Sequence, residues 1–278
     1  MKKILFPTDF SETANNAFIF ALNIAQKNNA VIYVLHIYKS PIINSRIPAE
    51  FISKYNLDAE LKSFENFKDK SKAMHKFADE NGFSDVELKL ILREGYFTKN
   101  INEFVDEEKD IDLVVMGTNG ASSYLEKTFF GSNTVNTIEN LNIPVLSVPA
   151  KAKINQEKTI AFTTLFKEKD KEALEQLIKI TQRFETKIYC LHVNKNNKDL
   201  DKVLIEWKKH FEGKPVVFEI LNYEGSLNKS ILNFVKENKI GMIAAVSRNL
   251  NFFEELFSPS FTKSISYESD IPIYIFKK

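Results

Sequence analysis

Glycines gather in one short stretch of this chain, directly after an apolar run. Three of its eight glycines, Gly117, Gly120 and Gly131, fall within fifteen residues that follow the run Ile111–Met116. Glycine lacks a Cβ atom and tolerates positive φ, so the main chain there can approach a bound group closely. Backbone N–H groups bared in this way attract anions. The stretch predicts a phosphate-binding loop after a buried strand; the alternative is a connection whose glycines only serve turns.

The residues after the last glycine add donors at the start of a predicted helix. They are polar and consecutive: Ser132, Asn133 and Thr134. A helix N-terminus presents unpaired N–H groups and the positive end of the helix dipole, both of which favour a bound anion. The chain contains no Gly-Lys-Ser or Gly-Lys-Thr sequence, which excludes a P-loop NTPase.

A carboxylate follows the first predicted strand, in the sequence Pro7-Thr8-Asp9. Asp9 there could accept hydrogen bonds from a ribose hydroxyl or hold a metal ion on phosphates. The same residues also fit a helix start, because Asp9 and Glu12 match a capping box and Ser11 is a second candidate N-cap. Ligand binding and capping therefore both remain open for this corner.

Apolar, β-branched runs alternate along the chain with stretches of helical spacing. Such runs are typical of strands buried on both faces of a parallel sheet. The first helical stretch carries apolar residues three and four apart: Ala14, Ala17, Phe18, Ala21, Leu22 and Ala25. Each half predicts five strands and four helices, a doubly wound, Rossmann-like α/β unit with a parallel sheet. That topology brings Asp9 beside the glycine loop.

The chain contains the same unit twice. KILFPTDF (Lys3–Phe10) matches TIAFTTLF (Thr159–Phe166), and IPVLSV (Ile143–Val148) matches IPIYIF (Ile271–Phe276). A short polar linker, Ala150–Lys158, separates the copies. The repeat predicts two tandem domains, residues 1–150 and 151–278.

One segment breaks the symmetry of the copies. Between the second strand and the second helix the first half has a long connection, 39–57, where the second half has only a short one, 194–200. Long connections are often functional. We expect this one to lie over the same rim as the glycine loop, either as a lid or as a plain surface insertion.

Composition excludes several classes of function. Lysine and arginine (38) nearly balance aspartate and glutamate (37), which argues against nucleic-acid binding. Cys190 is the only cysteine and lies in an apolar run, so we expect a buried thiol that packs as a small hydrophobe. No apolar run is long enough to span a bilayer. The sequence predicts a soluble, cytoplasmic protein without membrane contact.

In their order, the opening KILFPTDFS, the run DLVVMGTNG with GSNT, and the closing IPVLSVP resemble the universal stress protein family. The likeness covers the chain as two tandem copies and is stronger in the first. It implies units paired through their last strands, and ATP binding where the glycine motif is intact, with or without magnesium. By position, Asp9, with Pro7 and Thr8 beside it, and the main chain near Ile37 would face adenosine. The resemblance assigns the ribose and phosphates to Met116, Gly117, Thr118, Gly120, Gly131, Ser132, Asn133 and Thr134.

Both copies depart from the family pattern. The first has ten residues between its second glycine and the Gly-Ser pair, 121–130, where the family has nine. In the second copy Leu165 stands opposite Asp9, the stretch 246–249 opposite Gly117 and Gly120, and Ser258 and Pro259 opposite Gly131 and Ser132. Proline lacks the N–H that a phosphate would need. The second copy is therefore expected to bind no nucleotide.

Three functions follow from this reading. The leading one is a non-catalytic, ATP-binding sensor or signalling module of the stress response. A slow ATPase is the second, with Asp9 as the one evident candidate base. An interaction scaffold that binds no nucleotide is the third. The sequence leaves open whether two chains associate as a homodimer.

Overall fold

The computed structural model describes residues 1–39, 49–118, 132–154, 158–195, 200–247 and 271–277. In the N-terminal half, five strands and four helices alternate as predicted. They are β1 (Lys3–Thr8), α1 (Glu12–Asn28), β2 (Val31–Tyr38), α2 (Ala49–Glu80), β3 (Leu88–Glu94), α3 (Phe97–Glu107), β4 (Leu113–Gly117), α4 (Ser132–Asn140) and β5 (Val145–Val148).

The C-terminal half follows the same plan. Its elements are β6 (Thr159–Thr163), α5 (Glu168–Thr181), the 3-10 helix η1 (Gln182–Phe184), β7 (Lys187–Asn194), α6 (Leu200–His210), β8 (Val216–Asn222), α7 (Leu227–Glu237), β9 (Met242–Ser247) and β10 (Ile273–Lys277). The fourth helix predicted for this half falls between β9 and β10, outside the described residues.

The long connection predicted for residues 39–57 is wrong in its second part, because α2 begins at Ala49. Ala49 and Glu50 favour a helix, and Phe51, Ile52 and Tyr55 continue a helical spacing that the prediction did not use. Residues 40–48 lie outside the described residues, so the lid stays a prediction for that part alone.

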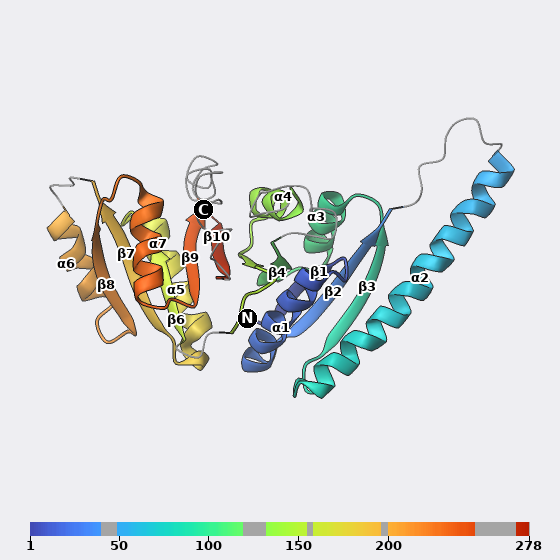
Figure 1. Cartoon of the computed structure of the whole chain (residues 1–278), viewed down its shortest axis with the longest axis horizontal. Coiled ribbons are helices and arrows are strands. Elements are labelled where there is room, and N and C mark those ends of the chain that lie inside the picture. The colour runs from blue at the N-terminus through green and yellow to red at the C-terminus, as the bar shows by residue number, and fades with distance from the viewer. Residues whose placement is uncertain (40–48, 119–131, 155–157, 196–199, 248–270, 278) are drawn as a thin grey trace.

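One mixed sheet of ten strands runs through both halves (Figure 1), in the order β3-β2-β1-β4-β5-β10-β9-β6-β7-β8. Neighbouring strands are parallel within each half, whereas β5 and β10 pair antiparallel. The pairs across this junction are Ile273 with Ser147, Tyr274 with Leu146, and Ile275 with Val145. The α/β class, the doubly wound order and the pairing of the halves through their last strands are confirmed.

Strand register confirms the internal repeat. The equivalent pairs are Ile4 with Ile32 and Leu113 in the first half, and Ile160 with Ile188 and Met242 in the second. Counting along the strands from these pairs makes Val246 the equivalent of Gly117 and Leu165 the equivalent of Asp9.

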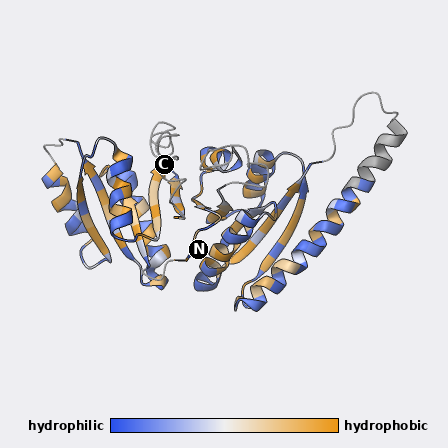
Figure 2. Cartoon of the chain, viewed as in Figure 1, coloured by the Kyte–Doolittle hydropathy of each residue, from blue (hydrophilic) through white to orange (hydrophobic). Residues whose placement is uncertain are grey.

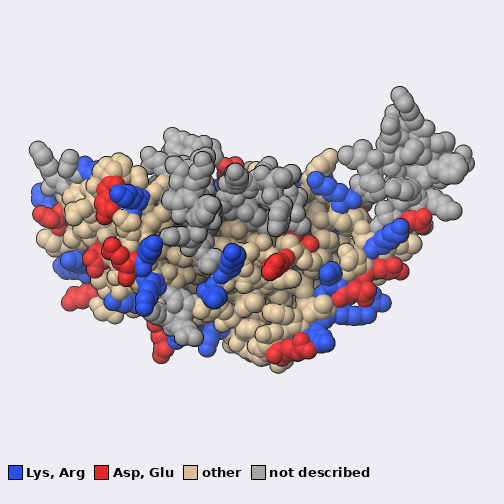
Figure 3. Space-filling view, viewed as in Figure 1, with Lys and Arg blue, Asp and Glu red and all other residues tan. Residues whose placement is uncertain are grey.

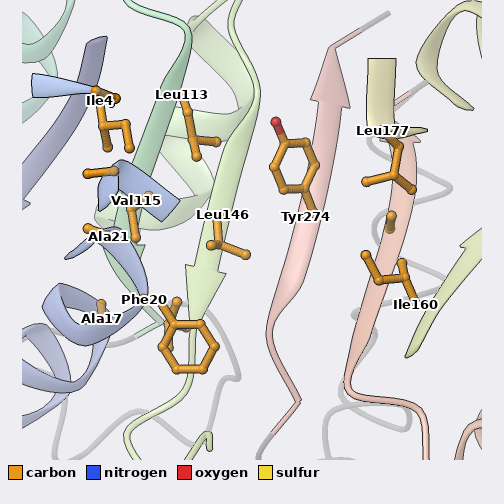
Figure 4. Close-up of a cluster of buried hydrophobic side chains, with 14 of the residues drawn as sticks. Ile4, Ala17, Phe20, Ala21, Leu113, Val115, Leu146, Ile160, Leu177 and Tyr274 are labelled. Carbon is orange, nitrogen blue, oxygen red and sulfur yellow. The ribbon is translucent and has the colours of Figure 1, made fainter. Parts of the chain in front are cut away.

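Two apolar cores cover the two faces of the sheet. Helices α1, α2, α5 and α6 contribute to one core, and α3, α4 and α7 contribute to the other. The strands are predominantly hydrophobic, and the helices show polar residues beside apolar ones (Figure 2). Each core contains residues from both halves, and Leu146 and Tyr274 meet where β5 lies beside β10 (Figure 4). The halves therefore share continuous apolar cores across the junction.

Candidate functional site

The candidate site lies where the chain changes direction within the sheet of the N-terminal half. The chain runs outward from β1 to β3 and then crosses back to β4 on the other side of β1. In open α/β sheets, ligands bind at this switch point, beyond the carboxyl ends of the strands. β1 pairs with β4 at Ile4 and Leu5, and both strands continue past these pairs, to Thr8 and Gly117. The predicted site residues at the ends of β1 and β4 are thus brought to one edge.

Asp9 is exposed at the end of β1 and is oriented by the turn into α1. Its Oδ1 atom accepts a hydrogen bond of 3.0 Å from the N–H of Ser11. Phe10 between them has φ of 58°, in the left-handed region, and its N–H donates to Thr8 Oγ1 at 3.0 Å. Such side-chain to backbone bonds are typical of tight turns. Asp9 is therefore held by its own loop with its carboxylate at the surface.

The helix start assigns capping to Ser11. Ser11 is extended, with φ of −69° and ψ of 164°, and its Oγ accepts from the N–H of Ala14 at 3.2 Å. The alternative in which Asp9 and Glu12 form a capping box is therefore wrong, because Asp9 lies two residues before the N-cap. Ser11 is the N-cap of α1, and the exposed carboxylate of Asp9 is not the group that caps this helix.

A histidine ties the ends of β1 and β2 together. His36 Nδ1 lies 2.7 Å from the carbonyl oxygen of Thr8, which can only accept, so Nδ1 carries the proton. The rings of His36 and Phe10 are 4.7 Å apart. Ile37, predicted to bring its main chain to adenosine, is half-buried directly after His36 on β2, and Pro7 is buried within β1. This histidine fixes the edge that carries the predicted adenosine contacts.

Gly117 has a packing reason for lacking a side chain. A Cβ atom at Gly117 would lie 2.8 Å from Thr13 Cγ2 and 3.2 Å from the Thr13 main chain. Its φ is not in the left-handed region, so no turn requires glycine at this position. α1 can therefore lie close against β4 only because residue 117 is glycine. Met116, the residue before it, is buried in the opposite core.

The start of α4 is fastened to the end of β4 by a buried threonine. Thr134 Oγ1 lies 3.1 Å from the carbonyl oxygens of both Gly117 and Thr118 and donates to them. Thr118 is itself buried, and its N–H donates to Val148 O at 3.0 Å. The Thr134 hydroxyl and the Thr118 N–H thus bond within the fold, and the contacts of Thr118 and Thr134 with a phosphate stay a prediction.

Asn133 is exposed in the first turn of α4, which begins at Ser132. The structure therefore brings the N-terminus of α4 to the carboxyl end of β4. The two other glycines of the motif, Gly120 and Gly131, lie outside the described residues, as does the ten-residue spacer between them. Their role stays a prediction.

The equivalent corner of the C-terminal half is built differently. Leu165 replaces Asp9 and is 43% exposed, and the buried side chain of Val246 replaces Gly117. A fully buried carboxylate, Asp170, closes this corner: its Oδ2 accepts from Thr164 Oγ1 and Leu165 N at 2.9 Å and from Lys167 N at 3.1 Å. Ser258 and Pro259 lie outside the described residues.

Sequence reasoning missed Thr13 and Asp170. The role of Thr13 depends on how closely α1 approaches β4, which no spacing reveals. Asp170 could have been found by aligning the halves, because it stands opposite the apolar residue Ala14. The histidines of the two halves make the same bond: His192 Nδ1 lies 3.0 Å from Thr164 O, as His36 Nδ1 lies 2.7 Å from Thr8 O.

Metal binding and thiol chemistry find no support in the described part of the chain. No group of three or more His, Cys, Asp or Glu residues there is arranged to hold a metal ion. Cys190 is buried, and burial raises the pKa of its thiol far above the usual range, as expected for a thiol that packs as a hydrophobe. None of the described helices has the length and hydropathy needed to cross a membrane. Charges of both signs are interspersed on the face shown in Figure 3.

Comparison with known proteins decides the family. The profile of the universal stress protein family matches residues 1–149, which is more than half of the chain. The chain belongs to the universal stress protein family. The resemblance found in its motifs is thereby confirmed.

Two universal stress proteins of Methanocaldococcus jannaschii are similar to the chain in sequence. Universal stress protein MJ0531 is 36% identical over 148 residues, which make up 53% of this chain and 81% of that protein. Universal stress protein MJ0577 is 30% identical over 160 residues, 54% of this chain and 96% of that protein. Each of these relatives therefore matches about half of the present chain.

A solved structure matches the chain over nearly its full length. The universal stress protein from Archaeoglobus fulgidus DSM 4304 covers 99% of this chain and 96% of its own, with a TM-score of 0.68 and 20% identity. This likeness concerns the fold, and it supports a tandem arrangement of two universal stress protein units.

Proposed function

We propose that the N-terminal half of this universal stress protein binds ATP at the switch point between β1 and β4, and that the chain acts as a non-catalytic sensor or signalling module. One observation carries the proposal: the exposed Asp9 carboxylate stands at the edge where β4 leads to the N-terminus of α4. An acceptor for the hydroxyl groups of a sugar or the N–H groups of a base thus lies near the N-terminus of α4, and helix N-termini attract phosphates.

The residue roles follow from this placement. Asp9 accepts from the nucleoside, and the main chain of Ile37, Met116 and Gly117 borders it. The N–H groups at the start of α4, at Ser132 and Asn133, hold phosphate oxygens, together with Gly120 and Gly131. Magnesium, where present, neutralises the phosphate charge and takes its remaining ligands from water.

The C-terminal half is proposed to bind no nucleotide. Its corner presents Leu165 in place of a carboxylate, and the Val246 side chain fills the position of Gly117. The buried carboxylate of Asp170 already accepts the N–H groups of Leu165 and Lys167. We propose that residues 1–150 form the nucleotide-binding domain and residues 151–278 a partner domain that completes the sheet.

The proposal is tested by calorimetric titration of the whole chain with ATP, ADP and AMP. We expect one ATP per chain. Asp9→Ala should weaken ATP binding by roughly tenfold to a hundredfold, the range for a hydrogen bond to a charged group. Leu165→Ala, at the equivalent exposed position of the other half, is the matched control and should leave the affinity unchanged.

Further outcomes separate the alternatives. Asp9→Asn keeps an acceptor for the Ser11 N–H but loses the charge, so it distinguishes a folding defect from a lost ligand contact. Absence of heat with every nucleotide would favour the scaffold. Release of phosphate that stops in Asp9→Ala would favour the slow ATPase.

A further inference from the structure

Helix α4 is the short element on which the proposed phosphate contacts depend. It has nine residues, Ser132–Asn140. Its N-terminal end is fastened to β4 by Thr134, which donates to the carbonyl oxygens of Gly117 and Thr118. Its last turn contains no basic residue. Helices this short are marginal by themselves, so contacts at both ends decide how firmly α4 is held.

The other half of the chain supplies the missing cation. Lys277, at the end of β10, places its Nζ 2.5 Å from Glu139 O and 3.4 Å from Ile138 O. These carbonyls belong to the last turn of α4, where helical hydrogen bonds run out. A cation there also interacts favourably with the negative end of the helix dipole.

The antiparallel junction explains why this contact forms. Ile275 of β10 pairs with Val145, the first residue of β5, so β10 continues past the start of β5 toward the segment that joins α4 to it. Side chains alternate between the faces of a strand. Ile273 and Ile275 lie in the core that contains Ile138 of α4, and Lys277 is next on that face.

The contact between Lys277 and α4 has no counterpart from the end of β5 in the first half. Where IPVLSV aligns with IPIYIF, Lys277 corresponds to Pro149 of the first half. Proline has no amine and cannot offer a cation to the other half. The contact of Lys277 therefore runs in one direction only, from the C-terminal half to α4 of the half that carries the glycine motif.

We infer that Lys277 is a positioning residue for the nucleotide site: the C-terminal half, through the Lys277 ammonium, holds the C-terminus of α4 and thereby the phosphate-binding end of the same helix. This inference rests on the proposed function for its link to ATP. Its structural step, that Lys277 stabilises α4, does not.

The test uses the full chain and three variants. Lys277→Met removes the charge and keeps an unbranched side chain, whereas Lys277→Arg keeps the charge. Lys209→Met is the matched control, because Lys209 is an exposed basic residue in the last turn of α6 in the same half. Amide hydrogen exchange of α4 is measured without nucleotide, ATP affinity by calorimetry, and thermal unfolding confirms that each variant is folded.

We expect Lys277→Met to speed exchange in α4 and to weaken ATP binding, each by about twofold to fivefold, the effect of one cation at a helix terminus. Lys277→Arg should restore both, and Lys209→Met should change neither. Wild-type exchange in Lys277→Met, or faster exchange with unchanged affinity, would overturn the inference. If the wild-type chain binds no ATP, the proposed function and the link to it fail together, while the exchange data still decide whether Lys277 holds α4.

Discussion

Gly117 shows that a glycine in a ligand motif can be required by packing. Its missing Cβ makes room for Thr13 of α1, and its carbonyl oxygen accepts from Thr134. A larger residue there would displace α1 whether or not a nucleotide binds, so loss of binding in such a variant would not identify a contact. Asp9 is exposed, and none of the described helices packs against it as α1 packs against Gly117, so it is the better residue for testing the site.

The buried hydroxyl group of Tyr274, at the junction of the halves, gives a prediction at the scale of single residues. Tyr274 is 2% exposed, and its hydroxyl has no hydrogen-bond partner among the described residues. The ring points from β10 toward β5 (Figure 4), and burial raises the pKa of the phenol, so the group stays neutral. An unsatisfied buried polar group is costly.

We therefore expect Tyr274→Phe to raise the free energy of unfolding by about 1 kcal/mol. Chemical denaturation measures this change. Tyr223→Phe is the control, because the exposed Tyr223 hydroxyl donates to Gly225 O at 2.7 Å and its loss should be neutral or slightly destabilising. A clear loss of stability in Tyr274→Phe would show that its hydroxyl has a partner after all.

At the scale of elements, α1 and α5 start in two different ways. The N-terminus of α1 is capped by the Ser11 hydroxyl, which leaves the carboxylate of Asp9 exposed. The N-terminus of α5 is instead held by the buried carboxylate of Asp170, which accepts from three donors. The same strand-to-helix turn is thus open at the surface in one half and closed from within in the other.

This difference predicts unequal costs of removing the two groups. Ser11→Ala should lower the free energy of unfolding by about 1 kcal/mol, the usual value of an N-cap. Asp170→Ala should lower it by about 2–4 kcal/mol, because it leaves the buried Thr164 hydroxyl and two part-buried N–H groups without their acceptor. Equal losses in denaturation experiments would contradict the assignment of Asp170 as the internal closure of this corner.

The order of elements could be predicted from the sequence because buried parallel strands and amphipathic helices leave different spacings. The start of α2 was missed because the helical spacing of Phe51, Ile52 and Tyr55 was not used. The contact of Lys277 with α4 depends on antiparallel register and on side-chain reach, which sequence spacing does not contain. The placement of Asp9 and the start of α4 at one edge of the sheet could be predicted from the topology alone.

At the scale of the whole molecule, the two halves behave as one sheet. The core on the α1 face runs from Ile4 and Leu113 through Leu146 and Tyr274 to Ile160 (Figure 4). Because this apolar core continues across the junction, we expect the two halves to unfold cooperatively. Trp207, the only tryptophan, is buried in the C-terminal half and reports on that half alone.

Leu113→Ala should therefore destabilise both halves together. Leu113 is fully buried in the N-terminal half, and its truncation is expected to cost about 2–5 kcal/mol. We expect Trp207 fluorescence and far-UV circular dichroism to shift to the same lower midpoint. A fluorescence transition that stays at the wild-type midpoint would mean that the halves unfold independently.

The most direct test of the central claim is a crystal structure of the whole chain grown with excess ATP. The account predicts one nucleotide, at the carboxyl ends of β1 and β4, with its nucleoside beside Asp9 and its phosphates at the start of α4. Crystals that contain no nucleotide, or that hold it at the ends of β6 and β9 beside Leu165, would contradict the account.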